Sequence, residues 1–228
     1  MDLAEAWEAH AQEWIAWARA PGLDGFWDGT WPLLRSVLPA PAGLVIDLGC
    51  GEGRVGRQLL ELGYEVVGIE QSPTLAGAVS TGDPSFPVIR ADAAALPLFP
   101  GSAALVVACM LLIDVDDLDG TVREAAQALR AGGDLCIAIV HPFDSAQDVA
   151  AVGTDDVLVT EAYLESRRYE VQIEREGLGM TFVSMHRPLS TYVSALSRAG
   201  LAVTAMEESG ERLVPWLLVL RASKVTAQ

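Results

Sequence analysis

A glycine-rich turn after a short apolar run constrains the fold of this chain more than any other feature. The run 44–48, interrupted only by Asp47, has the nearly continuous apolar pattern of a strand buried on both faces of a sheet. Glycines follow at positions 49, 51, 53 and 56. Glycines at such a strand-to-helix turn let the backbone approach a ligand closely, and the next helix N-terminus offers free N–H donors. The segment therefore predicts a ligand site at the end of a first buried strand.

Short apolar runs alternate with helical stretches along the chain, which is the pattern of βαβ units and a parallel sheet. The expected strands are 44–48, 64–69, 86–90, 104–108, 134–140, 201–206 and 216–220. The expected helices are 55–62, 73–79, a helix that follows the acidic stretch 114–119 and is closed by the glycines at 132 and 133, and 189–199. The pattern indicates a single α/β domain.

Two segments lie outside this alternation. Near the N-terminus, apolar residues recur at helical spacing and form one stripe: Leu3, Trp7, Ala11, Trp14 and Ala18. This stripe predicts a helix that either docks on the domain or covers a ligand pocket as a lid. After the fifth strand, a polar stretch from 142 to about 161 leads into alternating residues at 169–174 and a glycine turn before 180–186, which is typical of an inserted antiparallel ribbon.

These patterns predict one domain with four parts. The parts are a helical lid at 1–35, a ligand-binding core at 36–141, an insertion over a second site at 142–187, and the end of the sheet at 188–228. We expect no separate second domain, because no linker-like stretch divides the chain.

Charge excludes several classes of partner. The 228 residues carry 31 Asp and Glu against 15 Lys and Arg, a net charge of −16, and only Arg167 and Arg168 are adjacent cations. Nucleic-acid binding depends on clustered cationic side chains, so nucleic acids and anionic membranes are poor partners. No apolar run approaches the roughly 18 residues of a membrane span, and 1–5 lacks the pattern of a signal peptide. We expect a cytoplasmic monomer or homodimer that acts on a small molecule.

Cysteine and histidine are too scattered for a metal centre or a disulfide framework. Cys50, Cys109 and Cys136 lie far apart without a Cys-x-x-Cys pair, and His10, His141 and His186 have no ligand spacing. The sequence therefore predicts no metal.

The glycines fit two alternative frames. Gly51-x-Gly53-x-x-Gly56 matches a dinucleotide fingerprint, and Glu70 stands about 20 residues on, where an acid that binds ribose is expected. In the other frame, Asp47 stands at the strand end and glycines follow at every second position.

The position of the strand end favours the second frame. A dinucleotide fingerprint starts directly at the strand end, whereas the first frame leaves 48–51 unexplained between strand and turn. Asp47 would also place a carboxylate near a pyrophosphate, which is an unfavourable contact between like charges. A ligand with an ammonium group and no phosphate suits this carboxylate. S-adenosylmethionine, an adenosine that carries a sulfonium and a zwitterionic methionine, is such a ligand.

Five motifs, in order, resemble those of the class I S-adenosylmethionine-dependent methyltransferases, and the resemblance runs over about 44–220. The motifs lie at 45–53, 67–70, 90–93, 104–112 and 129–133. The resemblance implies a Rossmann-like, doubly wound, mostly parallel seven-stranded sheet with an antiparallel last strand, to which this chain adds its N-terminal lid helix and the ribbon after strand five. It also implies a methyltransferase (EC 2.1.1.-) that uses S-adenosyl-L-methionine, forms S-adenosyl-L-homocysteine and methylates a small molecule.

The resemblance assigns residues to the cofactor. Glu70 would accept hydrogen bonds from both ribose hydroxyls, each contributing about 1.5–3 kcal/mol. Asp92 would meet the adenine amino group, and Met110 would lie against the adenine or the sulfonium. The expected cofactor-binding residues are Asp47, Gly49, Cys50, Gly51, Glu70, Gln71, Asp92, Ala93, Met110, Trp14 and Arg19.

Several of these residues have structural alternatives. Asp92 is also suited to cap the turn before Leu96, and Met110 to fill the core. Arg19, which the resemblance aims at the methionine carboxylate, is equally suited to a surface salt bridge, and Arg54 to the surface of the helix after the glycines.

Methyl transfer from a sulfonium is an in-line displacement, so alignment in a dry pocket supplies much of the catalysis, about 7–11 kcal/mol. A base is needed only when the acceptor is a hydroxyl or a protonated amine. The candidate bases are His141, at the carboxyl end of the fifth strand, and His186, at the end of the ribbon, and each has a purely structural alternative. His10 is expected in solvent.

Two other functions stay open at this point. An NAD(P)-dependent oxidoreductase would use the same glycines in the dinucleotide frame, and a non-catalytic protein would keep the cofactor fold without turnover. The sequence carries no readable pattern for the methyl acceptor.

Overall fold

The strands of the computed structural model form at the predicted apolar runs. The structure describes residues 1–146, 161–209 and 214–225. The strands are β1 (Leu44–Leu48), β2 (Glu65–Glu70), β3 (Val88–Arg90), β4 (Ala103–Cys109), β5 (Leu129–Val140), β6 (Arg167–Arg175), β7 (Leu178–His186), β8 (Leu201–Glu208) and β9 (Leu217–Lys224). The helices are α1 (Leu3–Ala9), α2 (Ala11–Arg19), α3 (Trp31–Val37), α4 (Arg54–Glu61), α5 (Pro73–Ser80), α6 (Leu118–Ala128), α7 (Pro142–Ser145) and α8 (Leu189–Arg198). Short turns of other helix types lie at Phe26–Thr30, Leu111–Ile113 and Glu161–Leu164.

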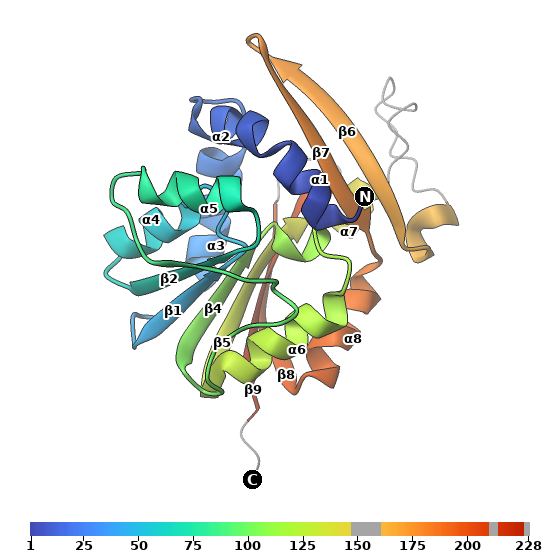
Figure 1. Cartoon of the computed structure of the whole chain (residues 1–228). Helices are drawn as coiled ribbons and strands as arrows, with labels where there is room; N and C mark the ends of the chain where they lie inside the picture. The colour runs from blue at the N-terminus through green and yellow to red at the C-terminus, as the bar shows by residue number, and fades with distance from the viewer. Residues whose placement is uncertain (147–160, 210–213, 226–228) are drawn as a thin grey trace.

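Seven of these strands form one sheet in the order β3-β2-β1-β4-β5-β9-β8 (Figure 1). β1 pairs in parallel with β2 and with β4, whereas β9 runs antiparallel to both β5 and β8. This arrangement confirms the predicted Rossmann-like, doubly wound, mostly parallel seven-stranded sheet with an antiparallel last strand. The strand order reverses between β1 and β4, and ligands of open α/β sheets bind at such a switch point.

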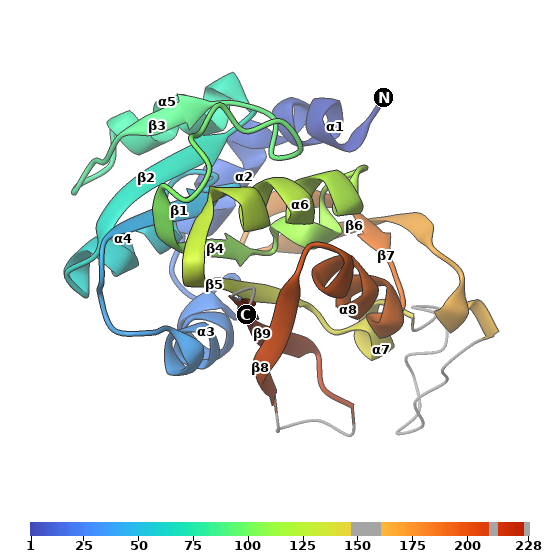
Figure 2. The ribbon, with the colours of Figure 1, turned by 90° about the horizontal axis from the view of Figure 1, so that it is seen from below.

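Helices cover both faces of the sheet. α3 and α4 lie on one face, and α6 and α8 lie on the other (Figure 2). Adjacent residues of β1 point to opposite faces, so that Val45 packs in the layer with α3 and α4 and Ile46 packs in the layer with α6 and α8. Because both faces of the central strands are buried, their sequences are nearly continuous apolar runs.

Local caps fix the helices that start at the carboxyl edge of the sheet. Ser72 Oγ accepts a hydrogen bond from Leu75 N at 3.0 Å, and Pro73 follows at the first turn of α5. Asp117 Oδ1 accepts a hydrogen bond from Gly120 N at 2.8 Å and caps α6. A side-chain cap and an N-terminal proline satisfy or remove orphan N–H groups of the first turn. These caps fix where α5 and α6 begin, just after β2 and β4.

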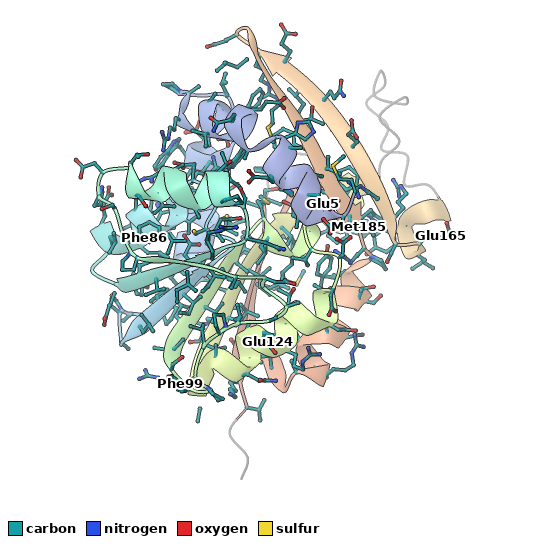
Figure 3. The ribbon with its side chains drawn as sticks, viewed as in Figure 1. Glu5, Phe86, Phe99, Glu124, Glu165 and Met185 are labelled. Carbon is teal, nitrogen blue, oxygen red and sulfur yellow. The ribbon has the colours of Figure 1, made fainter. Side chains whose placement is uncertain are left out.

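The predicted ribbon forms from β6 and β7, which pair antiparallel as a separate two-stranded sheet. The ribbon extends past the main sheet and runs beside α1 and α2 (Figure 1). Leu3 and Ala6 of α1 pack on Val183 and Met185 of β7. Figure 3 shows Met185 beside Glu5 of α1. The N-terminal helices and the ribbon therefore form one layer, which we call the roof.

The N-terminal segment differs from the single helix that its stripe predicts. The chain breaks at His10, with φ −102° and ψ 10°, and this residue ends α1 and precedes α2. His10 Nδ1 lies 3.0 Å from Glu13 Oε2 rather than being free in solvent. Trp7 and Trp14 meet edge-on across the break, with their ring centroids 5.8 Å apart. Seven residues of straight helix would separate their Cα atoms by about 10 Å along the axis, so the break helps these two rings to meet.

The helix before the fifth strand also ends earlier than predicted. α6 ends at Ala128, and Leu129–Gly133 already belongs to β5 instead of closing the helix with glycine. Leu129 is fully buried and pairs with Ala103 of β4. The pairing with β4 places 129–133 in a strand, so the prediction that Gly132 and Gly133 end a helix is wrong.

Other boundaries shift by up to four residues: the last strand ends at Lys224 instead of 220, and the third strand starts at Val88 instead of 86. Within the expected polar stretch at 142–161, the structure describes α7, and 147–160 lie outside the described residues. None of the helices in the described ranges has the length and apolar character needed to cross a bilayer.

Candidate active site

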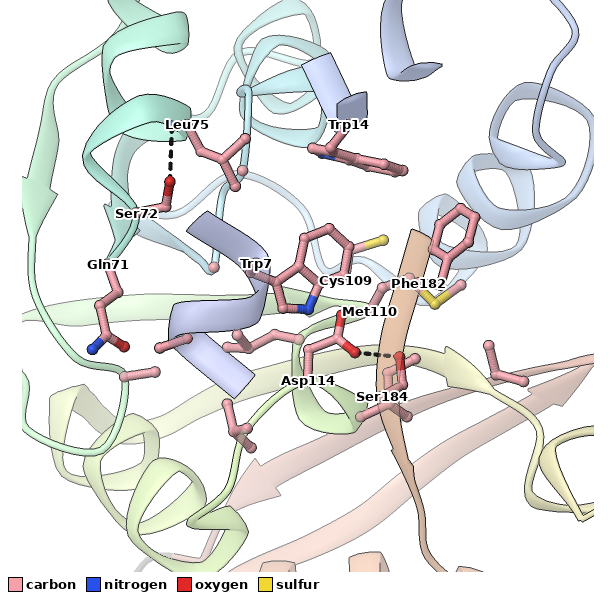
Figure 4. A pocket seen from close by; sticks show the side chains of 18 of the residues that line it. Trp7, Trp14, Gln71, Ser72, Leu75, Cys109, Met110, Asp114, Phe182 and Ser184 are labelled. Carbon is pink, nitrogen blue, oxygen red and sulfur yellow. Dashed lines mark hydrogen bonds between the residues drawn. The ribbon is translucent and has the colours of Figure 1, made fainter. Parts of the chain in front are cut away.

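A cavity of about 1240 Å³ opens at the carboxyl ends of the central strands. Its walls include the segments that follow β1, β2, β3 and β4, and the roof encloses it from the other side. The lining divides into two halves. One half is formed by the glycine turn and the strand ends, and the other by the inner face of the ribbon and the segment after β4 (Figure 4).

The glycine turn is held against the end of β2. The backbone N–H groups of Gly49 and Cys50 both donate to the carbonyl oxygen of Ile69, at 2.8 Å and 3.0 Å. Gly49 has φ +69°, and a Cβ there would lie 2.5 Å from Leu111 Cδ1. Gly51 has φ +58°. Glycine is needed at 49 for both its backbone conformation and the space, which leaves the turn's backbone bare toward the cavity.

Glu70 ties this turn to the start of α5. Its Oε2 accepts a hydrogen bond from Gly51 N at 2.9 Å, and its Oε1 accepts one from Ser72 N at 2.8 Å. Burial raises the pKa of Glu70, and the backbone N–H groups of Ser72 and Gly51 oppose that shift. The backbone N–H of Gln71 also bonds to the carboxyl, and Glu70 lines the cavity with acceptor capacity left for a ligand.

Asp47 lies behind the turn and does not line the cavity. It is buried, and the backbone N–H of Gly56 in α4 hydrogen-bonds to it. Its Oδ2 has no partner among the described residues. Burial raises the pKa of Asp47 to about 7, opposed by that backbone N–H. The sequence reasoning took this carboxylate to face the ligand, whereas its contact in the structure is with the helix that follows the turn.

The cavity wall also contains the other residues that the sequence suggested for the cofactor. They are Cys50, Gln71, Asp92, Ala93 and Met110 near the strand ends and Trp14 of α2. Asp92 Oδ1 also caps its turn by accepting from Ala94 N at 2.9 Å. Met110 adopts a left-handed conformation, with φ +61°, and packs against both core layers as well as facing the cavity. The structural alternatives for Asp92 and Met110 are thus present, and both residues also lie where a ligand in the cavity would reach them.

Arginine is distributed differently from the sequence expectation. Arg19 is not part of the cavity wall, and it donates to Glu52 Oε2 at 3.4 Å and to the carbonyl oxygen of Ala78 at 3.1 Å. Arg54 lines the cavity instead, paired with Asp24 and lying 4.7 Å from the ring centroid of Trp14. A salt bridge to a segment 30 residues upstream holds Arg54 in place, and no local sequence signal marks it.

The two candidate histidines lie outside the cavity wall. His141 caps α7, where its Nδ1 accepts from Phe143 N at 3.0 Å and its Nε2 lies 2.8 Å from Glu208 Oε1. His186 Nε2 lies 2.9 Å from the carbonyl oxygen of Tyr163, and its Nδ1 lies 2.7 Å from Ser145 Oγ. Burial lowers the pKa of His186. Because both ring nitrogens of each histidine are engaged, the structural alternative describes them better than direct contact with a substrate.

The ribbon half of the cavity has a polar centre that the sequence reasoning missed. Asp114 follows the turn after β4, and its Oδ1 accepts a hydrogen bond from Ser184 Oγ on β7 at 2.6 Å (Figure 4). The indole nitrogen of Trp7 points toward the same carboxyl (Figure 4). Tyr169 of β6 pairs with Ser184 across the ribbon.

One sequence signal could have found Asp114. It is an acid between the apolar residues Ile113 and Val115, just after a buried strand, at the same sheet edge as Glu70. Ser184 and Trp7 could not be assigned in that way, because their role depends on the ribbon and α1 meeting in space. Within the described ranges, no group of three or more His, Cys, Asp or Glu is placed to hold a metal ion.

Comparison with known sequences agrees with this geometry. Residues 46–137 match the methyltransferase domain family. An uncharacterized methyltransferase of Mycobacterium tuberculosis is 31% identical over 99 residues, which are 43% of this chain and 40% of that protein. The match thus spans less than half the length of the curated relative.

Solved structures extend the likeness to nearly the whole chain. An S-adenosylmethionine-dependent methyltransferase from Mesorhizobium loti is 29% identical, with a TM-score of 0.68, over 86% of this chain and 99% of that one. The cyclase SpnF shares the fold at 14% identity, with a TM-score of 0.69, over 100% of this chain and 98% of that one. Residues 46–137 thus resemble a methyltransferase domain, and the chain has the fold of S-adenosylmethionine-dependent methyltransferases of known structure.

Proposed function

We propose that this protein transfers a methyl group from S-adenosylmethionine to a small-molecule acceptor. The observation that carries the proposal is the convergence of three consecutive strand ends on one cavity: the glycine turn after β1, Glu70 at the end of β2, and Asp92 after β3. Backbone donors and a carboxyl that presents two acceptor oxygens match a nucleoside that bears a ribose diol.

The residues present fit this cofactor. Gly49 and Gly51 leave bare backbone where a side chain would otherwise stand, and Glu70 has acceptor capacity left for the ribose hydroxyls. Glu52 is buried, lines the cavity, and has no partner for Oε1 among the described residues. Its Oε2 pairs with Arg19 and Arg57, and Glu52 thus completes the wall on the side expected for the methionine moiety. When bound, the cofactor supplies an electrophilic methyl group on a positively charged sulfur.

The remaining cofactor contacts follow from the same wall. Gln71, Asp92 and Ala93 border the position expected for the adenine, and Met110 and Trp14 supply the apolar contacts. Cys50 completes the turn. Asp47 acts from behind, holding the start of α4 in position through the Gly56 N–H. Arg54 closes the wall in the place where the sequence suggested Arg19.

The size of the cavity favours a second ligand. Sites for one drug-sized molecule measure roughly 300–1,000 Å³, and this cavity is larger, at about 1240 Å³. The space beside the strand ends is walled by the ribbon and by Trp7. We assign this half to a small acceptor, aligned there with the methyl group and shielded from water by the roof.

Calorimetric titration tests the cofactor assignment directly. S-adenosylhomocysteine should bind and NADH should not. Tight NADH binding without a response to S-adenosylhomocysteine would instead indicate an oxidoreductase. Binding without any consumption of methyl-labelled cofactor across an acceptor panel would indicate a non-catalytic cofactor protein.

A variant makes this test specific to the ribose contact. Glu70→Ala should weaken S-adenosylhomocysteine affinity by at least about tenfold, equivalent to about 1.4 kcal/mol. Glu65→Gln, at the exposed opposite end of β2, is the matched control and should stay within about twofold of the wild type. Equal affinities of the Glu70→Ala variant and the wild type would mean that the ribose binds elsewhere.

A further inference from the structure

We propose that the methyl acceptor is an amine, and that Asp114 binds its ammonium group and takes up the proton that the nitrogen must lose before methylation. This inference rests on the proposed function and concerns the ribbon half of the cavity. It makes Asp114 the catalytic base in place of the two histidines.

Three elements hold Asp114 in position. It lies just after the turn that follows β4, Ser184 on β7 donates to its Oδ1 at 2.6 Å, and the Trp7 indole of α1 points at it (Figure 4). The cavity wall includes all three residues. Asp114 is therefore a fixed carboxyl on the acceptor side, at the same sheet edge as the cofactor residues.

Charge in this half favours a cation. Among the described lining residues on this side, the acids besides Asp114 are Asp2, Asp116, Asp117, Asp144 and Glu170, against the single cation Arg167. Arg167 Nη2 donates to the carbonyl oxygen of Ser145 at 3.2 Å. The summed field of such a wall attracts an ammonium group and repels carboxylates and phosphates.

The inner face of the ribbon suits an amine with an apolar body. The cross-strand pairs on this face change from polar to apolar along the ribbon. Tyr169 pairs with Ser184 beside Asp114, and Val171 pairs with Phe182 beside Trp14. These four residues line the cavity. A molecule with its nitrogen at the polar pair would lay its hydrocarbon part along the apolar pair.

Burial makes Asp114 suited to holding a proton. It raises the pKa of Asp114 to about 8, opposed by the Ser184 hydrogen bond, the Trp7 indole and the nearby Arg187. The titratable and charged groups that face this region from the packed elements are Tyr169 of β6, Tyr192 of α8 and Arg187, which follows β7. Arg187 is engaged with the carbonyl oxygen of Leu112, at 3.0 Å.

The proton balance follows from this state. At neutral pH, Asp114 is mostly protonated and the free amine is an ammonium ion, so binding releases one proton to solvent. The proton that remains is shared between carboxyl and nitrogen, and a dry cavity favours the neutral pair, with the proton on Asp114. The amine lone pair then forms the N–C bond as the C–S bond breaks, and the electron pair of that bond stays on sulfur. The methylated amine leaves as an ammonium ion and Asp114 keeps the proton of its resting state, so the one proton that the reaction gives off is the one released on binding.

Binding to the protein loaded with S-adenosylhomocysteine tests the inference without turnover. The probes are three matched compounds: 2-phenylethylamine, 2-phenylethanol and 3-phenylpropanoate. The amine should bind at least about tenfold more tightly than either of the others. Calorimetry in buffers of different ionisation enthalpy should show the release of close to one proton per amine bound at pH 7.

Two variants separate Asp114 from general charge effects. Asp114→Asn should remove both the amine preference and the proton release, and should keep S-adenosylhomocysteine affinity within about twofold of the wild type. Glu174→Gln, on the exposed outer side of the same ribbon, removes one charge as well and should keep both signals. Preference for the alcohol or the carboxylate, no measurable amine binding, or an amine preference that survives Asp114→Asn would overturn the inference. If the wild type fails to bind S-adenosylhomocysteine, the proposed function itself fails.

Discussion

Replacing Asp114 by asparagine should stabilise the protein, and the gain should grow with pH. Burial raises the pKa of Asp114 to about 8 in the folded state, against about 3.9 for an aspartate in an unfolded chain. Between these values the folded state holds a proton that the unfolded state has lost. The contribution of Asp114 to the free energy of unfolding therefore falls as pH rises through this window, and this contribution is largest below about pH 4. Asparagine cannot ionise, and its amide oxygen keeps an acceptor for Ser184.

The structure sets the size of this effect. One pKa unit corresponds to 1.36 kcal/mol, so the full shift would reduce stability by about 4 kcal/mol at pH 7. Local relaxation around the ionised carboxyl lowers this penalty, and we expect about half of it, about 2 kcal/mol.

Urea unfolding at pH 5, 6, 7 and 8, followed by tryptophan fluorescence, measures the difference between the two proteins. The stability advantage of Asp114→Asn should increase from pH 5 to pH 8, while the Glu174→Gln control should run parallel to the wild type. An advantage that is constant with pH, or that shrinks as pH rises, would refute the assignment of a raised pKa to Asp114. A gain in stability on removing a charge is the expected trade-off at a functional site.

Two further predictions concern the turn and the ribbon. Gly49→Ala should lower the free energy of unfolding by about 1–3 kcal/mol more than the control Gly63→Ala. Both glycines have positive φ, but only at position 49 would the new Cβ meet a neighbour, Leu111. Equal losses in urea unfolding would show that the turn accommodates the methyl group. His186 should titrate below 6.5 in an NMR experiment, because burial lowers its pKa, and its contribution to stability is present above pH 6.5 and lost as pH falls below it. A measured pKa at or above 6.5 would contradict this account.

The strands of the main sheet could be predicted because both of their faces are buried. Runs such as 104–108 and 134–140 consist almost entirely of apolar residues because both faces of the strand are buried. This pattern is visible in the sequence without any knowledge of the packing partners. The alternation at 169–174 likewise marked the ribbon, whose strand β6 has one half-buried and one exposed side. Local patterns failed where a distant partner decides the structure, as at Leu129, whose pairing with β4 ends α6 early.

The candidate site divides in the same way. The strand-end residues around the glycine turn are predictable, because each follows a buried strand and parallel strands end at one edge of the sheet. The exchange of Arg19 for Arg54 and the contact between Asp114 and Ser184 depend on segments that meet only in the folded chain. Such contacts join segments tens of residues apart and leave no periodic mark in the sequence.

The roof also has a consequence for how the protein is made. The backbone N–H of Thr181 on β7 lies 3.4 Å from the carboxylate of Glu13 in α2, 168 positions earlier in the chain. During synthesis, the tryptophan-rich helices α1 and α2 therefore cannot pack on the ribbon until the ribbon has left the ribosome. Until then their apolar surface is exposed and accessible to chaperones. The strands that hold the glycine turn are synthesised well before that moment. We expect the nucleoside half of the molecule to order first and its enclosure to be the last step of assembly.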